Sequence, residues 1–135
     1  MKRFLFRLWQ WIWGFPQNLV GAILWLTHRN CPRGQYRSCS VTFWNQRGSM
    51  SLGNFLFMGS DNPEVFVHEF GHCIQSALLG PLYLPVMGLP SFLWCNLPFC
   101  RRLRREKGIS YYAFYPESTA NSLGMLATGE QCHLQ

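Results

Sequence analysis

The chain opens with a stretch, residues 4–26, in which aromatic and aliphatic side chains are interrupted by only a few polar ones. Pro16, Gln17 and Asn18 divide it into a tryptophan-rich half and an aliphatic half. At about 1.5 Å per residue the stretch is just long enough to cross a bilayer of roughly 30 Å, while its polar break suits a broken amphipathic helix at a membrane interface equally well. The pattern predicts membrane attachment, and the alternative is a covering helix packed on the rest of the protein.

Residues 39–57 change to a strand-like pattern. Apolar residues lie on both sides of the turn-prone segment 45–48, so we expect two β-strands joined as a β-hairpin. The apolar positions are Val41, Phe43, Leu52, Phe55 and Phe57.

Two later segments carry helix start and stop signals. Polar capping candidates precede a first-turn proline in the segment 60–64, and a Gly-Pro pair follows Leu79, which predicts a helix over residues 63–79. A Pro-Glu pair at 116–117 opens a final helix, which should run to about Ala127 and end at a Thr-Gly pair.

The segment between these helices, residues 82–100, carries no charge. Three prolines and a glycine within it argue against a straight membrane-spanning helix, so a re-entrant, interfacial or core-buried segment is expected. A basic run follows at 101–107, and residues 108–115 are expected to form a loop or a strand.

The length of 135 residues fits one catalytic domain with appendages. We expect a membrane-associating segment at residues 1–30 and a compact domain at residues 31–135. Because 48% of the residues are apolar, 16% aromatic and only 13% charged, we also expect something besides water to cover part of the surface.

Basic residues cluster beside apolar stretches, and no nucleic-acid-binding motif accompanies them. Basic clusters next to apolar segments suit anionic membrane headgroups, so lipid is the expected partner and nucleic acid is not. We expect attachment at the cytoplasmic face of a membrane. The two main clusters are Lys2, Arg3 and Arg7, and Arg101, Arg102, Arg104, Arg105 and Lys107.

The N-terminus begins like a secretory signal but departs from one. Arg7 interrupts the apolar region, and no cleavage site of small residues follows the bulky tryptophans. We therefore expect no cleavable signal peptide, and the six cysteines are expected to stay reduced and unpaired.

The run His-Glu-Phe-Gly-His at residues 68–72 carries the clearest candidate chemistry. Positions four apart share one face of a helix, so His68 and His72 can bind one Zn²⁺ while Glu69 lies beside them. Zinc lowers the pKa of a water molecule, and a neighbouring carboxylate can take its proton as the water attacks a carbonyl. Cys73 points about 100° away from His72 and is expected in the core.

A third protein ligand is needed, and the chain has few acids outside the motif. Those at 61 and 64 suit capping or helix-dipole roles, Glu106 lies in a basic run, and Glu130 follows the last helix. Glu117 remains the strongest candidate, although stabilisation of its own helix is an alternative role. His133 and His28 are the weaker choices for this ligand.

Asn121 lies four residues after Glu117 on the same helix face, where its amide oxygen can accept a hydrogen bond from a ligand histidine. Three tyrosines between the two helices are candidates for stabilising an oxyanion, with core packing as the alternative. They are Tyr111, Tyr112 and Tyr115.

His-Glu-x-x-His followed by a glutamate on a later helix resembles the gluzincin branch of the zincin metallopeptidases. The resemblance implies that His68, His72 and Glu117 bind zinc and that Glu69 is the general base. Gluzincins often carry an aspartate where this chain has Asn121, which keeps a hydrogen-bond acceptor and removes a charge.

A fuller pattern covers most of residues 65–124 and resembles short bacterial membrane-associated proteins and the ends of some large repeat-containing bacterial proteins. Those relatives usually carry a tryptophan where this chain has Thr119. The matching segments are His-Glu-Phe-Gly-His-Cys-Ile-Gln-Ser at 68–76, Gly-Pro-Leu-Tyr-Leu at 80–84, Gly-Leu-Pro-Ser at 88–91 and Tyr-Ala-Phe-Tyr-Pro-Glu-Ser-Thr-Ala-Asn-Ser-Leu-Gly at 112–124.

These features together lead us to expect an α+β, zincin-like domain that hydrolyses peptide bonds of a peptide or protein substrate at a membrane surface. The alternative is a non-catalytic, zinc-stabilised membrane adaptor, and a third hypothesis is a membrane-active basic peptide fused to a cryptic domain. An intramembrane protease of the site-2 type ranks lower, because its distant Leu-Asp-Gly motif is missing and Asp61 precedes the first ligand.

Overall fold

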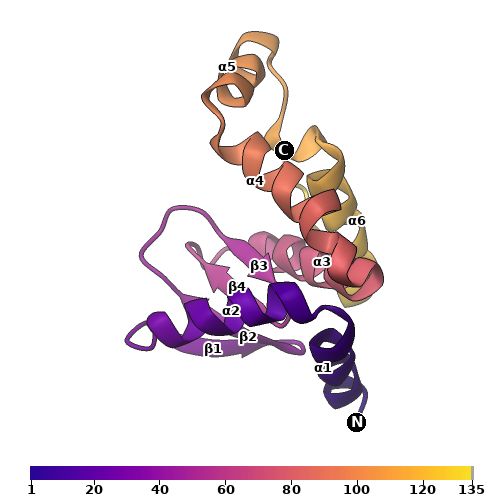
Figure 1. The fold of residues 1–135 in the computed structure, drawn as a ribbon. Coiled ribbons are helices and arrows are strands. Elements are labelled where there is room, and N and C mark those ends of the chain that lie inside the picture. Colours follow the sequence, from indigo (N-terminus) through magenta and orange to yellow (C-terminus); the bar gives the residue numbers. More distant parts are fainter. Residues whose placement is uncertain (135) are drawn as a thin grey trace.

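Six helices and a four-stranded mixed sheet form the protein, described for residues 1–134 in a computed structural model (Figure 1). This confirms the expected α+β class. The helices are α1 (Lys2–Trp13), α2 (Phe15–Thr27), α3 (Pro63–Leu79), α4 (Leu89–Asn96), α5 (Pro98–Lys107) and α6 (Tyr115–Thr128). Shorter helical turns are η1 (Gly80–Leu82), η2 (Leu84–Gly88) and η3 (Tyr111–Ala113).

The sheet has the strand order β1-β2-β4-β3, and its central pair, β2 and β4, is parallel. Strand β1 pairs antiparallel with β2, and β3 pairs antiparallel with β4. The strands are β1 (Arg33–Tyr36), β2 (Cys39–Phe43), β3 (Met50–Leu52) and β4 (Phe55–Met58).

The predicted hairpin with its turn at residues 45–48 is wrong. That segment belongs to a longer connection that carries the chain from β2 past β4 to the far edge of the sheet. The tight turns lie instead where the backbone takes positive φ, at Arg37 (54°) and Gly53 (61°). A Cβ atom on Gly53 would lie 2.4 Å from the Asn18 side chain, so only glycine fits there.

The two predicted later helices are confirmed as α3 and α6. Asn62 caps α3 by accepting a 3.0 Å hydrogen bond from the Glu64 backbone N–H, and Gly80 ends the helix with a φ of 55°. Gly129 ends α6 with a φ of 73°. Residues 108–114 form a loop with the turn η3 and no strand, Tyr115 begins α6, and the basic run is helix α5.

The sheet lies between helices, with α3 on one face and α2 on the other (Figure 1). On the α3 face, side chains of β2 and β4 pack against Phe70 and Cys73. On the opposite face, Phe55 and Phe57 are covered by α2 residues such as Trp25. This core holds α3 against the sheet and fixes the direction of its His-Glu-Phe-Gly-His run.

The N-terminal stretch forms two helices that break at Gly14, slightly before the expected polar break. Across residues 1–134, no single helix has the length and hydropathy needed to cross a bilayer. The consecutive segments Pro63–Leu82 and Leu84–Asn96 together have the required length and hydropathy, but the chain bends by 120° between them.

Candidate metal centre

Helix α3 presents His68, Glu69 and His72 on the side that faces α6 and the main cavity. The histidines are four residues apart, so their rings lie one turn apart, with centroids separated by 4.8 Å. All three side chains are almost completely buried. Buried polar groups require partners, which α6 and α3 supply for the two histidines.

Glu117 reaches the histidines from the first turn of α6. Its Oε2 lies 3.0 Å from His68 Nε2 and 3.2 Å from His72 Nε2. The three candidate donor atoms lie within 4.8 Å of one another, and all three residues are buried. The geometry therefore offers two imidazole nitrogens and one carboxylate oxygen to a single ion.

Two glycines let α3 and α6 approach closely enough for this arrangement. A Cβ atom on Gly71 would lie 1.8 Å from the Ala120 carbonyl oxygen, and one on Gly124 would lie 2.1 Å from the Val67 carbonyl oxygen. Neither distance is compatible with a side chain. Backbone contact between the helices thus places Glu117 opposite the histidines.

Side-chain amides hold the other nitrogen of each imidazole. His68 Nδ1 lies 2.6 Å from Asn121 Oδ1, and His72 Nδ1 lies 2.8 Å from Gln75 Oε1. The Gln75 amide is oriented by its donor nitrogen, which bonds the Pro116 carbonyl oxygen at 2.8 Å, so its oxygen must accept. These contacts at Nδ1 turn the Nε2 atom of each ring toward Glu117.

Glu117 is held as a carboxylate. Burial by itself raises the pKa of this side chain, but hydrogen bonds from His68 and His72 outweigh burial and the pKa is lowered below its usual range. The Ser91 hydroxyl, from α4, donates to the other carboxylate oxygen, Oε1. A charged oxygen is what a zinc ligand at this position needs.

Glu69 is the least satisfied group of the centre. Its Oε2 is buried without a hydrogen-bond partner. Burial raises the pKa of Glu69 to about 7, with His68 opposing the shift and Glu117 adding to it. A buried carboxyl with this pKa and an unpaired oxygen can exchange a proton near neutral pH.

The centre lies in a cavity of about 890 Å³ between the β3 edge of the sheet and the α4 region. Tyr111 and Tyr112 line it, and the Tyr112 ring packs edge-on against His68 with centroids 5.1 Å apart. Tyr115 does not line it, and its hydroxyl donates to the Val86 carbonyl oxygen at 2.6 Å. Tyr83 is buried and also lines the cavity, which was not predicted from the sequence.

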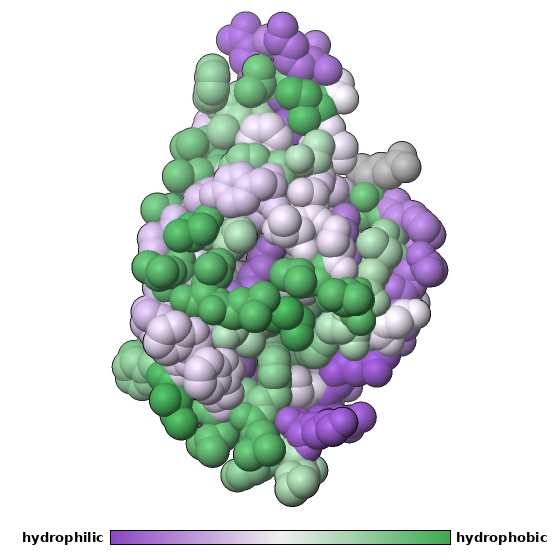
Figure 2. Space-filling view, turned by 90° about the vertical axis from the view of Figure 1, so that its right-hand side faces the viewer, coloured by the Kyte–Doolittle hydropathy of each residue, from purple (hydrophilic) through white to green (hydrophobic). Residues whose placement is uncertain are grey.

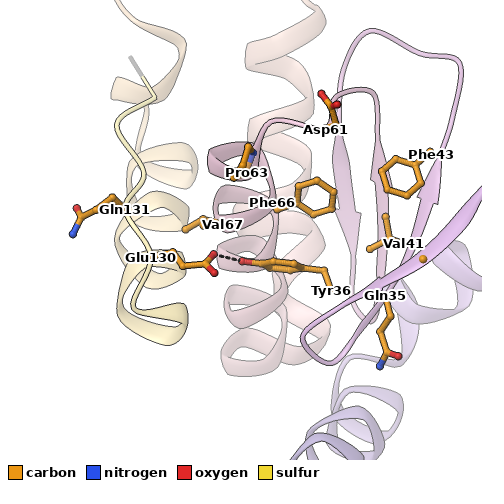
Figure 3. Close-up of a pocket in the computed structure, with 11 residues that line it drawn as sticks. Gln35, Tyr36, Val41, Phe43, Asp61, Pro63, Phe66, Val67, Glu130 and Gln131 are labelled. Carbon is orange, nitrogen blue, oxygen red and sulfur yellow. Dashed lines mark hydrogen bonds between the residues drawn. The ribbon is translucent and has the colours of Figure 1, made fainter.

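The acids rejected as third ligand in the sequence lie away from His68, His72 and Glu117. Glu130 lines a separate pocket of about 550 Å³ and accepts a 2.7 Å hydrogen bond from the Tyr36 hydroxyl (Figure 3). Asp61 lines the same pocket, and Glu106 pairs with Arg102 on α5. Among the weaker choices, His28 lines the main cavity without joining the ligand group, and His133 is exposed.

Cys73 lies in the core, as the helix geometry predicts, with its Sγ 3.1 Å from Cys39 Sγ. Gln75 and Ser91 are the polar residues of the centre that sequence reasoning missed. Gln75 could have been predicted from the sequence, because it follows His72 by three residues and therefore lies on the same face of the helix. Ser91 could not be identified from the sequence, since no spacing within α4 connects it to the His-Glu-Phe-Gly-His run.

The residues present fit a zinc ion. Two imidazoles and one carboxylate are a ligand set used by catalytic zinc sites, and the unpaired Glu69 oxygen provides an acceptor beside it. Comparison with protein-family models, curated proteins and solved structures finds no match to this chain, so its function is inferred from the site alone.

Proposed function

We propose that this chain is a zinc-dependent metallopeptidase. The proposal is supported above all by one arrangement: two histidine nitrogens and one carboxylate oxygen converge, with the unpaired Glu69 oxygen beside them in an open cavity. A site that only held the fold together has no need of an unpaired buried carboxyl oxygen, which costs stability.

Zinc held by His68, His72 and Glu117 would supply Lewis-acid chemistry, lowering the pKa of a water molecule and polarising a peptide carbonyl. Glu69 takes the proton of the attacking water on its free Oε2. The same oxygen then returns that proton to the leaving amine, so the carboxyl starts and ends in one state. Asn121 and Gln75 keep the imidazole rings in place during the reaction.

Tyrosines of the cavity wall supply neutral hydroxyl donors. Burial raises the pKa of Tyr111, and also that of Tyr112, so both keep their protons at neutral pH. We assign oxyanion stabilisation to one of these two residues. Tyr115 is the weakest of the three original candidates, because its hydroxyl is already bonded outside the cavity.

One observation favours the alternative of a non-catalytic zinc site in a membrane adaptor. The residue behind His68 is the neutral Asn121 and not a carboxylate, which leaves the imidazole less basic than in most gluzincin sites. The neutral residue at position 121 should lower catalytic activity more than it lowers zinc binding.

Glu69→Gln separates the two functions. Under both, the variant should bind zinc with unchanged stoichiometry, measured by elemental analysis. Only the peptidase proposal predicts that cleavage of a peptide library falls about a hundredfold or more. Glu106→Gln, an exposed change on α5, is the matched control and should cleave normally. Equal cleavage by Glu69→Gln and wild type would contradict the catalytic role.

The ligand assignment has its own test. Glu117→Ala should weaken zinc binding more than tenfold in a chelator competition, since it removes the anionic donor, whereas Glu130→Ala should not. Unchanged zinc affinity in Glu117→Ala would show that the proposed ligand set is wrong.

A further inference from the structure

Helices α1 and α2 bury polar side chains and expose apolar ones. Gln10, Gln17 and Asn18 are completely buried, whereas most outward-facing side chains are Phe, Leu, Ile, Val or Trp. Ile12, for example, is 69% exposed. This is the reverse of the pattern that water imposes on a surface helix.

The buried amides hold the two helices to α3. Gln10 Nε2 donates to the Cys73 carbonyl oxygen at 2.7 Å, and Gln17 Nε2 donates to Ser76 Oγ at 2.8 Å and to the Gly80 carbonyl oxygen at 2.9 Å. Polar contacts between helices with apolar outer faces are typical of packing in lipid, where apolar side chains gain nothing by turning inward.

The exposed apolar side chains continue from α1 and α2 over η1, η2 and α4; we call this set the apolar surface. Trp13 packs so closely on Gly80 that a Cβ there would lie 2.4 Å from its ring, which joins α1 to η1. Phe92 on α4 is 60% exposed. Figure 2 shows hydrophobic residues over much of this side of the molecule, with hydrophilic ones at the top, where Figure 1 places α5.

Positive charges flank the apolar surface. Lys2 and Arg3 are exposed at the start of α1, and Arg105 and Lys107 are exposed on α5. The chain carries a net charge of +6. A second copy would bring equal positive charge to the same contact, whereas anionic lipid headgroups would neutralise it.

We propose that the apolar surface is seated among the acyl chains of an anionic bilayer, with the basic residues of α1 and α5 at its headgroups. Leu89 and Phe92 belong both to this surface and to the wall of the metal-centre cavity. The cavity rim therefore lies at the lipid. A polypeptide lying in the same leaflet then has the shortest route to Glu69, a consequence that rests on the proposed function.

Vesicle flotation of the full chain tests the docking without using zinc or activity. Wild type should float with vesicles of phosphatidylcholine and phosphatidylserine. Ile12→Ser on α1 and Phe92→Ser on α4 should each bind about tenfold more weakly, because each removes a large apolar side chain from hydrocarbon. Leu126→Ser is the matched control: Leu126 is 84% exposed on α6, outside the apolar surface, and its variant should bind like wild type.

The charge component is tested with Arg105→Gln combined with Lys107→Gln, which should lose most of the preference for phosphatidylserine over pure phosphatidylcholine. The proposal is overturned if wild type does not float, or if Leu126→Ser loses binding as strongly as Ile12→Ser. It is also overturned if Ile12→Ser and Phe92→Ser instead convert a lipid-free dimer into a monomer, which would identify a second copy as the occupant. Zinc content measured on the same samples separates these outcomes from failure of the metal centre.

Discussion

The two candidate ligand histidines are each fixed by a side-chain amide, but the amides come from different helices. Gln75 lies on α3 with its histidine, and Asn121 reaches His68 from α6. Gln75 also donates to Thr119 Oγ1 and to the Pro116 carbonyl oxygen of α6. Each imidazole is therefore oriented by a contact that depends on the packing of the two helices.

We expect the hydrogen bond between Asn121 and His68 to affect how strongly the site binds zinc. Asn121→Ala removes the acceptor of the 2.6 Å bond to Nδ1 and should weaken zinc binding about 10- to 100-fold. Asn121→Asp places a charge there and should strengthen it. Chelator competition measures both, with Asn96→Ala on exposed α4 as control. Equal zinc affinity in all three variants would mean that this contact does not orient a ligand.

The site residues differ in how visible they are in the sequence. His68, Glu69 and His72 form a contiguous pattern, and the scarcity of acids leads to Glu117. Ser91 and Tyr83 belong to elements whose placement depends on tertiary packing, so no local spacing connects them to the motif. Helical periodicity relates residues within one helix and says nothing about which other helix faces it.

At the scale of elements, the contact between α3 and α6 decides whether the centre can assemble. Gly71→Ala would drive a methyl group into the Ala120 carbonyl oxygen, so the helices must separate. We expect a loss of about 3 kcal/mol in unfolding free energy and weakened zinc binding, because Glu117 moves with α6. Chemical denaturation and chelator competition measure the two effects.

Gly48→Ala is the control for that change. A Cβ on Gly48 meets no atom within 4 Å, and its backbone φ is not positive, so stability should change little. If Gly71→Ala were as stable as Gly48→Ala, the close approach of the helices would not be required.

Strand β1 is tied to the segment after α6 by Tyr36 and Glu130. Burial and this hydrogen bond raise the pKa of Tyr36 to about 12. The folded state thus favours the protonated phenol, a contribution that is complete below pH 10 and lost as pH rises through about 12. In an NMR titration, the Tyr36 ring should stay protonated at pH 11. Ionisation of Tyr36 near pH 10 would contradict the contact.

The elements were visible in the sequence to different degrees. Helix α3 has a capping asparagine, a first-turn proline and a terminal glycine, so its bounds were predicted correctly. The strand-like character of residues 39–57 was predicted correctly, but β1 was missed. The pairing was also not predicted, because alternation of side chains indicates a strand without identifying its neighbour. The parallel strands β2 and β4 need a long connection between them. Residues 45–48 are part of that connection, but their sequence resembles a hairpin turn.

At the scale of the whole molecule, α1 and α2 pack against the sheet and against α3, the helix that carries His68 and His72. Phe55 of the sheet is covered by Trp11 and Trp25, and Gln10 bonds the backbone of the motif helix beside His72. The buried polar side chains of the N-terminal helices therefore contact α3, whereas their apolar side chains face outward.

Deleting residues 1–27 should therefore abolish cooperative unfolding and zinc binding, because it uncovers Phe55 and removes the buried partners of the α3 backbone. The point variant Gln17→Leu tests the buried hydrogen bonds alone. It removes two of them near the end of α3 and should lower the free energy of unfolding by about 2 kcal/mol. Gln35→Leu, on exposed β1, is its control. A truncated chain that unfolds cooperatively and keeps zinc would show that residues 1–27 are an appendage, and the support of α3 would then have to come from the sheet alone.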